Sequence, residues 1–355
     1  MKTSLFNYSL PKNLIANSPA AKRDLSRLII IDRKTGKISH HKFFEIEKYL
    51  GNNDVLVLNK TKVFPARIFA KKATGGKIEI LFIEEIKEKV WTALVHTGGK
   101  IGTKILFKDY SFGIVGKKEQ MVLIDTNLDK TGMFNMLKKY GKTPLPPYIK
   151  SDEEESDLRK KYQTVYAEET GSVAAPTAGF HFTSDLLKRL EAKGVQIEYV
   201  TLHVGLGTFA PVKVKEIEDH PMHSEEFFVD KNTAARLNKA KMDGKRIIAV
   251  GTTSTRVLET LAASAKTGSL QMFPRNGKTK IFIFPPYQFK FVDALVTNFH
   301  LPESTLLTLV SAFVSYPNTK SKFKNFKTLL IGKAYEEAVK EKYRFYSFGD
   351  ACFIL

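Results

Sequence analysis

Short segments of alternating apolar and polar residues between positions 62 and 126 limit which folds the chain can adopt. Apolar and polar residues alternate in five short runs, at 67–70, 77–83, 90–95, 104–107 and 121–124. Glycines such as Gly75-Gly76 and Gly98-Gly99 separate the runs. Alternation with a period of two residues is typical of antiparallel strands, and glycine-containing connections favour tight turns. Residues 62–149 are therefore predicted to form a small antiparallel barrel or meander.

On both sides of this stretch, the sequence predicts helices and strands in alternation. A helical pattern at 41–50 lies between predicted strands at 28–31 and 55–58, and a second helix is expected from Thr183 or Ser184 to a stop at Gly194. Further strands are predicted at 195–204, 246–250, 281–284 and 294–296, with a helix after the strand at 246–250. The chain has 355 residues, more than one hydrophobic core usually serves.

The simplest arrangement that accounts for both patterns is of the α/β class. A large discontinuous α/β domain carries the small antiparallel β-barrel domain as an insertion. The α/β domain is expected to comprise residues 1–61 and 150–355, and the inserted barrel residues 62–149. The proline-rich segment 144–150, followed by an acidic run at 152–155, is typical of an extended, solvated exit segment and marks the second boundary.

Composition limits the class of protein. The longest strongly apolar stretch, 306–314, is about half the length that crosses a bilayer, and the first residues lack the apolar core of a signal peptide. The single cysteine, Cys352, excludes an intrachain disulfide and a thiolate metal cluster, which suits a reducing compartment. We expect a cytoplasmic protein that does not enter a membrane.

The formal net charge of +19 favours polyanionic partners, because a positive field attracts nucleic acid at long range. A lysine-rich composition also follows from a genome of low GC content, so charge alone leaves both interpretations open.

Four polar segments adjoin predicted element ends, and each contains a histidine: 171–183, 201–212, 222–227 and 296–307. Histidine exchanges protons near neutral pH, and a glutamate such as Glu225 does so when burial raises its pKa. A structural role is the alternative for any one of them. The four histidines (His181, His203, His223 and His300) and Glu225 are also competent metal ligands, but the chain lacks a helical His-x-x-Glu-His or His-Glu-x-x-His pattern, so no metal is expected.

Residues 205–210 match the dinucleotide-binding pattern G-x-G-x-x-A directly after a predicted strand. Pro211 and the alternating residues after it argue against the long helix that this pattern must open. The glycines still indicate a backbone that a flat ligand approaches closely. The segment 251–255, expected as a loop before its helix, is either an anion site or a simple helix cap.

Nine long segments, in order along almost the whole chain, are similar to those of one enzyme family, the S-adenosylmethionine:tRNA ribosyltransferase-isomerases. They lie at 14–36, 59–67 (NKTKVFPAR), 144–150 (PLPPYIK), 161–183, 201–212 (TLHVGLGTFAPV), 222–227 (MHSEEF), 246–259, 292–313 and 343–351 (YRFYSFGDA). The sequence departs from the family's usual residues at Phe180, Ser151 and Thr308.

The resemblance implies an α/β domain with an inserted β-barrel and a reaction with no bound cofactor. S-adenosylmethionine is a co-substrate that gives its ribosyl group to 7-aminomethyl-7-deazaguanine at the wobble position of tRNA. Epoxyqueuosine forms, and adenine and methionine leave. The partners are therefore S-adenosylmethionine and tRNA.

That chemistry needs a base at C5′ and an acid for adenine departure. Because they lie on loops and can change protonation, His203 and His181 are the first candidates, followed by Glu225 and His300. Gly205, Gly207 and Thr208 are expected to contact the S-adenosylmethionine, and Arg67, Arg256 and Asn298 to orient its carboxylate, ribose or base. Two alternatives remain, a conventional S-adenosylmethionine-dependent RNA methyltransferase and a non-catalytic RNA-binding protein.

Overall fold

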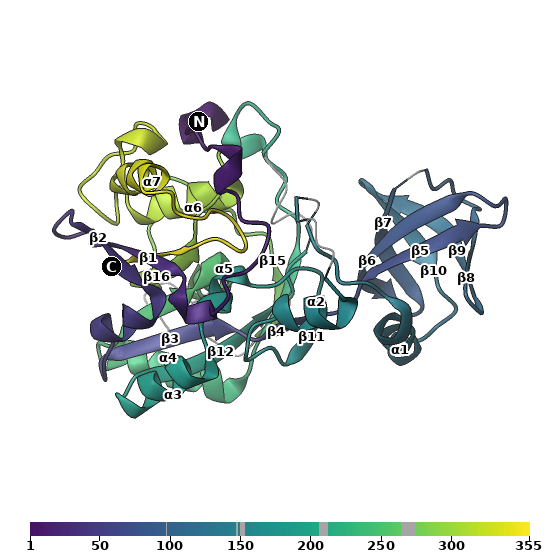
Figure 1. Ribbon diagram of the computed structural model, residues 1–355, viewed down its shortest axis with the longest axis horizontal. Helices are drawn as coiled ribbons and strands as arrows, with labels where there is room; N and C mark the ends of the chain where they lie inside the picture. Colours follow the sequence, from purple (N-terminus) through teal and green to yellow (C-terminus); the bar gives the residue numbers. More distant parts are fainter. Residues whose placement is uncertain (97, 147, 150–152, 206–211, 264–274) are drawn as a thin grey trace. The chain divides into compact units, whose positions relative to one another are not determined.

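The computed structural model describes all residues except 97, 147, 150–152, 206–211 and 264–274. Its chain divides into two compact units (Figure 1). The first, here the sheet unit, comprises Met1–Thr61, Thr164–Glu168 and Pro176–Leu355. The second, here the barrel unit, comprises Lys62–Gln163 and Glu169–Ala175. The barrel unit thus begins at the residue expected from the sequence and continues beyond residue 149.

The sheet unit is built on a nine-stranded mixed sheet in the order β15-β13-β12-β3-β14-β16-β17-β1-β2. The strands are β1 (Arg27–Ile31), β2 (Ile38–Lys42), β3 (Asp54–Asn59), β12 (Gln196–Leu202), β13 (Glu225–Val229), β14 (Arg246–Val250), β15 (Arg275–Thr279), β16 (Ala294–Asn298) and β17 (Ala351–Ile354). Together with the barrel described below, this confirms the predicted fold class.

Four central strands, β12, β3, β14 and β16, run parallel to their neighbours in that order. Their carboxyl ends therefore meet at one edge of the sheet, where open α/β sheets bind ligands. The residues that leave these ends are His203 after β12, Thr61 after β3, Gly251 after β14, and Asn298 at the end of β16. The chain thus brings polar residues from distant segments to a common edge.

The central strands are apolar because both faces of the sheet are covered. All six residues of β3 are buried, and so are all five of β16. On one face Leu56 and Leu58 of β3 join a core with Phe43 and Ile46 and with helix α3 (Ser184–Ala192). Helix α5 (Gly251–Ala263) contacts β3, β12, β14 and β16.

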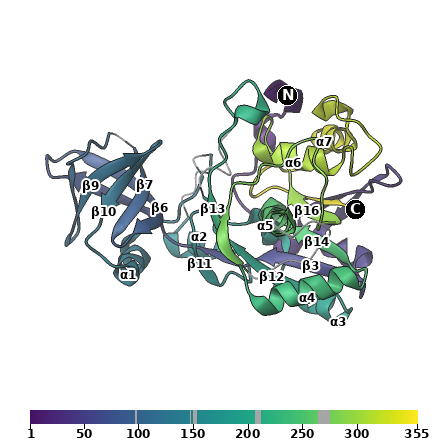
Figure 2. The ribbon, with the colours of Figure 1, turned by 180° about the vertical axis from the view of Figure 1, so that it is seen from behind.

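The helices of the sheet unit are α3 (Ser184–Ala192), α4 (Lys231–Met242), α5 (Gly251–Ala263), α6 (Thr305–Phe313) and α7 (Leu330–Lys340). Short 3-10 helices are η1 (Thr3–Phe6), η2 (Lys12–Leu14), η3 (Arg23–Leu25), η4 (Phe43–Tyr49), η5 (Thr177–His181), η7 (Ile217–Asp219) and η8 (Phe326–Thr328). Figure 2 shows α3, α4, α6 and α7 from behind. As predicted, α3 begins after Thr183, whose hydroxyl accepts the Leu186 N–H. None of the helices in the described ranges is long and apolar enough to cross a membrane.

The barrel unit contains a closed six-stranded barrel in the order β10-β7-β6-β5-β8-β9, in which neighbouring strands pair antiparallel. Its strands are β5 (Arg67–Lys72), β6 (Lys77–Lys87), β7 (Val90–His96), β8 (Lys104–Phe107), β9 (Tyr110–Lys118) and β10 (Met121–Asp125). Helices α1 (Lys130–Tyr140) and α2 (Glu155–Lys161) follow, and β4 (Thr61–Val63) pairs with β11 (Glu169–Ser172). The five predicted runs are strands, whereas β9 and α1 were not expected.

Two local predictions are wrong. Residues 281–284 form no strand, because side chains occupy their backbone groups: Thr279 Oγ1 accepts the Ile281 N–H and Arg256 Nε donates to the Ile281 carbonyl. Residues 251–255 form no loop. The chain passes from β14 directly into α5 at Gly251, whose φ of +85° lies in the region that glycine tolerates.

Candidate functional site

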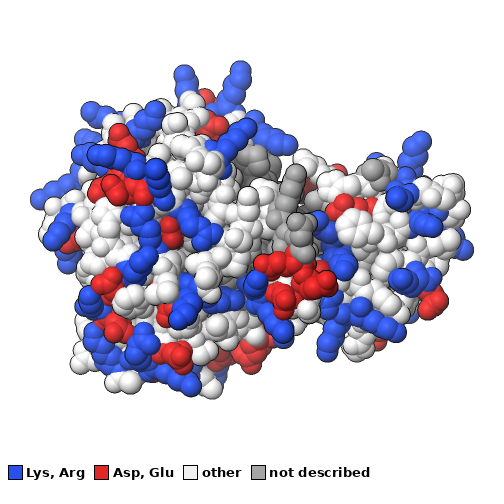
Figure 3. Space-filling model, viewed as in Figure 1, with Lys and Arg blue, Asp and Glu red and all other residues white. Residues whose placement is uncertain are grey.

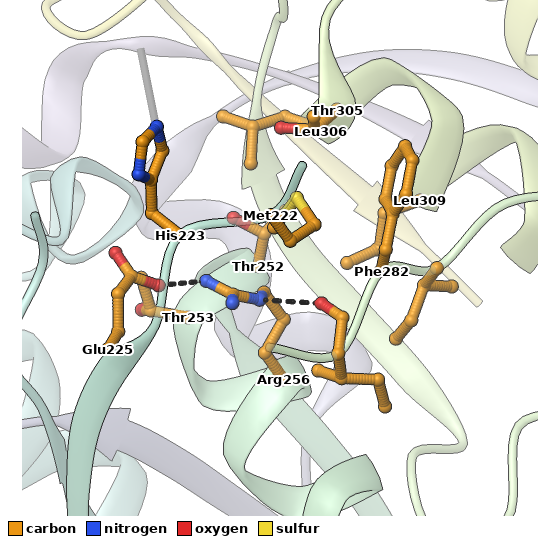
Figure 4. A pocket seen from close by; sticks show the side chains of 12 residues that line it. Met222, His223, Glu225, Thr252, Thr253, Arg256, Phe282, Thr305, Leu306 and Leu309 are labelled. Atoms are coloured by element: carbon orange, nitrogen blue, oxygen red, sulfur yellow. Dashed lines mark hydrogen bonds and ion pairs between the residues drawn. The ribbon is translucent and has the colours of Figure 1, made fainter. Parts of the chain in front are cut away.

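A pocket in the sheet unit gathers side chains from four separate stretches of the sequence (Figure 4). Two stretches follow or precede strands of the sheet, at 222–225 and 252–256, and two others lie at 281–283 and 305–309. The lining residues are Met222, His223, Glu225, Thr252, Thr253, Arg256, Ile281, Phe282, Ile283, Thr305, Leu306 and Leu309. Three of the four stretches coincide with segments that sequence analysis singled out.

An ion pair between Glu225 and Arg256 forms the charged part of this pocket. Arg256 Nη1 donates to Glu225 Oε2, and the side chains of Arg256 and Glu225 are only 6% and 4% exposed. The other carboxylate oxygen, Oε1, accepts the Gly205 N–H at 3.0 Å. Each carboxylate oxygen thus has a charged or backbone donor, which is what a buried carboxylate requires.

The pocket also contains polar atoms that the protein leaves unused. Arg256 donates through Nε to the Ile281 carbonyl at 3.2 Å and through Nη1 to Glu225, but Nη2 has no hydrogen-bond partner among the described residues. Within the same part of the chain, the buried Thr253 hydroxyl also lacks a partner. A buried polar atom without a partner costs roughly 1–3 kcal/mol, and native proteins keep few of them. Two on one helix at one pocket indicate a ligand site.

The remaining lining is largely apolar. Figure 4 labels Met222, Phe282, Leu306 and Leu309 among the side chains that line the pocket. A few polar groups among apolar walls are typical of small-molecule sites, since the walls bind and the polar groups orient.

His203 lies near the charged pair, one residue beyond β12. Its backbone N–H donates to the Glu226 carbonyl at 2.8 Å, in the strand that begins with Glu225. Its Nδ1 is 2.8 Å from Oγ1 of Thr61, two residues beyond the end of the neighbouring strand β3. His203 therefore occupies the carboxyl edge of the sheet, directly after β12, whereas the sequence analysis included it in the strand predicted at 195–204.

His181 and Asn298 form a second polar cluster at this edge, here the His181 cluster, together with Ser26 and Thr177. The His181 Nδ1 lies 2.7 Å from Ser26 Oγ, which donates to the Arg23 carbonyl. The Nε2 lies 3.2 Å from Asn298 Nδ2, and Asn298 Oδ1 accepts from Thr177 Oγ1 at 3.1 Å. Both ring nitrogens are thereby engaged, with Nδ1 as donor and Nε2 as acceptor in the neutral tautomer.

Burial keeps this imidazole neutral. His181 is 4% exposed, and burial, followed by the nearby charges of Arg23 and Arg344, lowers its pKa to about 3. His300 is also buried, and burial lowers its pKa to about 3. Its Nε2 is 2.9 Å from Thr297 Oγ1, and its backbone is held by the hydroxyls of Tyr8 and Tyr335. Neither histidine lines the pocket.

The other expected binding residues are in different places. Arg67 belongs to the barrel unit, where Nη2 donates to the Leu145 carbonyl at 2.9 Å and Nε lies 3.5 Å from Glu79. Gly207 and Thr208 lie outside the described residues. Among the residues that are described, no group of three His, Cys, Asp or Glu side chains is placed to hold a metal ion. The expectation that no metal or cofactor is needed stays a prediction.

Sequence reasoning missed several lining residues. Thr253 was noted only as part of an anion-binding loop or helix cap. Its neighbours Ser254 and Thr255 donate back to the carbonyls four residues earlier. Phe282 was attributed to a strand, and Met222 and Leu309 were not singled out. The run of four hydroxyl residues directly after a buried strand was the available signal, because helix interiors seldom favour it.

Comparisons with known proteins agree along the whole chain. A family model described as queuosine biosynthesis protein matches residues 3–354. A protein of Thermosipho melanesiensis named "S-adenosylmethionine:tRNA ribosyltransferase-isomerase" is 50% identical over 358 residues, which cover 100% of both chains. One of Thermotoga maritima with the same name is 49% identical over 360 residues, again with 100% of both chains covered.

A solved structure is also similar. The crystal structure of S-adenosylmethionine tRNA ribosyltransferase from Thermotoga maritima matches with a TM-score of 0.55 and 37% identity. The match covers 99% of this chain and 100% of that one.

Proposed function

The chain belongs to the queuosine biosynthesis protein family, and from this premise we propose that it is an S-adenosylmethionine:tRNA ribosyltransferase-isomerase. In the proposed reaction the ribosyl group of S-adenosylmethionine is transferred to 7-aminomethyl-7-deazaguanine in tRNA and isomerised, with release of adenine and methionine. Full-length identity of about half the residues to relatives with this name carries the proposal. It also favours this reaction over simple methyl transfer and over RNA binding without catalysis.

The pocket of the sheet unit supports S-adenosylmethionine as its ligand. The pocket lies at the end of the sheet where β14 continues into α5, and it offers unused donors together with apolar walls. A sulfonium nucleoside has matching parts: a flat base, ribose hydroxyls and a cationic sulfur. The apolar walls suit the flat base, and the donors without a protein partner suit its polar edge or the ribose hydroxyls.

The candidates for proton transfer are the titratable residues in or next to this pocket. Glu225 and His223 line it, and His203 lies beside the strand that carries Glu225. We propose that the base acting at C5′ is among these three. His181 and His300 are candidates from the sequence, and their buried, hydrogen-bonded imidazoles favour a structural role instead.

A positively charged surface supports tRNA as the second substrate. The net charge is +19, and Figure 3 shows Lys and Arg side chains spread over the visible face of both units. Neutralised phosphates release counterions, so binding of tRNA should weaken steeply as salt is raised. We expect the protein to act in the cytoplasm, where tRNA is modified.

The deciding experiment uses tRNA that carries 7-aminomethyl-7-deazaguanine. The protein is incubated with this tRNA and S-adenosylmethionine, nucleosides are identified by mass spectrometry, and free adenine is followed at the same time. Epoxyqueuosine and adenine in equal amounts are expected. Methylated nucleoside with S-adenosylhomocysteine would point to a methyltransferase, and unchanged but bound tRNA to a binding protein.

A further inference from the structure

We infer that the pocket between α5, the 281–283 segment and α6 is the subsite for the adenine base, with Arg256 Nη2 and Thr253 Oγ1 as the groups that contact its edge. This rests on the proposed function, since adenine is the base of the ribosyl donor. It assigns to Arg256 and Thr253 the recognition of a 6-aminopurine, and to Glu225 the positioning of Arg256.

The two pocket atoms without a protein partner match the hydrogen-bonding groups of adenine. Arg256 Nη2 is a donor without a partner in the described structure, and Thr253 Oγ1 both donates and accepts. Two edges of adenine present a ring-nitrogen acceptor next to the amino donor. Such an edge takes a hydrogen bond from Nη2 and returns one to Oγ1, so it satisfies both unused atoms together.

The ion pair in the pocket favours a neutral ligand. The Arg256 cation is already paired with the Glu225 carboxylate, and both are almost fully buried. A second carboxylate, such as that of the methionine moiety, would leave this buried group with a net negative charge, which is costly away from water. A neutral acceptor adds a charge-assisted hydrogen bond without that cost. The pair therefore selects a neutral heterocycle over an anion.

The apolar walls of the pocket suit a flat ligand. Phe282, Leu306 and Leu309 supply flat or branched apolar surface around the pocket, which suits the faces of a purine ring. Both unused atoms are shielded from solvent, so a lining side chain moves when the base enters. Met222 lines the pocket and is unbranched, which makes it the most adaptable of the lining residues.

The test measures binding of free adenine and free methionine to the full-length protein by calorimetry, in the wild type and in matched variants. Thr253→Val removes only the hydroxyl and should weaken adenine binding about tenfold, the worth of a typical hydrogen bond, while methionine binding is unchanged. Thr253→Ser keeps the hydroxyl and should restore adenine binding. Arg256→Lys keeps a cation for Glu225 and should weaken adenine binding more than Thr253→Val does, because a charge-assisted bond is lost.

Thr255→Val is the control. It makes the same chemical change on the same helix, but Thr255 donates to the Gly251 carbonyl and does not line the pocket. Adenine binding should stay at the wild-type level, and thermal melting confirms that every variant is folded. Adenine affinity that is the same in Thr253→Val, Arg256→Lys and the wild type would overturn the inference, as would a selective loss of methionine binding.

Failure of the proposed function has a different signature. In that case the wild type releases no adenine from S-adenosylmethionine and modified tRNA, whatever the variants bind. If the wild type turns over but shows no affinity for adenine, and the variants keep the wild-type KM for S-adenosylmethionine, the function stands and the adenine subsite is refuted.

Discussion

The pocket and the His181 cluster are two buried polar regions at the same sheet that differ in how completely the protein satisfies them. In the His181 cluster each ring nitrogen of His181 and the side-chain oxygen of Asn298 meet a protein partner. In the pocket, Arg256 Nη2 and Thr253 Oγ1 meet none within the described residues. Both regions contain residues that the sequence offered as candidates, and only their hydrogen bonds separate them.

The difference distinguishes a structural network from a binding site. A closed network stabilises the fold, and breaking it costs free energy of unfolding. Buried polar groups that lack a protein partner lower the stability of the free protein. A ligand that forms hydrogen bonds with them restores that stability when it binds. Substitutions in the His181 cluster should therefore lower stability more than activity. Removing a pocket group that has no protein partner should lower activity more than stability.

The largest effect is expected from Arg256→Met. This change leaves the Glu225 carboxylate buried without its charged partner, which should lower the free energy of unfolding by about 3–5 kcal/mol. Adding Glu225→Gln should recover most of that loss in urea denaturation, while turnover stays abolished in both proteins. Turnover that returns with stability would show that the pair serves the fold alone.

The next effect is expected from Asn298→Ala in the His181 cluster. The change leaves the His181 Nε2 and the Thr177 hydroxyl without their partner and should cost about 1–3 kcal/mol of stability. Turnover per folded molecule should fall less than about tenfold, because the cluster does not line the pocket. A greater loss of kcat with unchanged stability would move Asn298 back among the substrate-binding residues.

A pH titration of stability tests the neutral state of His181. Its pKa is lowered from 6.5 to about 3 in the folded protein, so between these values the unfolded chain binds a proton that the folded chain does not. The stabilisation is complete above pH 6.5 and is lost as the pH falls toward 3. In His181→Gln the slope of unfolding free energy against pH, measured near pH 5, should be shallower by about 1.4 kcal/mol per pH unit. Thr253→Val should keep the wild-type slope, and an equal slope in His181→Gln would disprove the neutral assignment.

The smallest effects come from removing one hydroxyl in each region. Ser26→Ala deletes a partner of His181 and should cost about 1 kcal/mol. Thr253→Val deletes a hydroxyl that has no partner in the described chain, so its stability should be equal to or slightly above that of the wild type. Thermal melting of the two variants side by side makes the comparison, and a larger loss in Thr253→Val would mean that its hydroxyl serves the fold.

Much of the fold was predictable because its periodicities are local. The apolar runs of β1, β3 and β14 are strands of the sheet, and five of the six barrel strands were recognised from alternation. Strand β9 was missed. The segment 281–284 was mistaken for a strand because its apolar residues face the pocket rather than a neighbouring strand.

The candidate site was predictable in its segments but less so in its residues. Glu225 and Arg256 were expected, and they form the charged pair. The role of Thr253 and the neutral state of His181 were not, because each depends on which atoms lie opposite the side chain.

Residue patterns along the chain were enough to predict the barrel and α/β regions, the family, and the segments that carry polar residues at strand ends. These patterns involve residues that are near one another in the chain. The shared pocket of Glu225, Arg256 and Thr253, and the network that Asn298 closes around His181, became visible only in the folded protein. Whether a polar side chain finds a hydrogen-bond partner depends on residues more than a hundred positions away in the chain, as between Asn298 and His181.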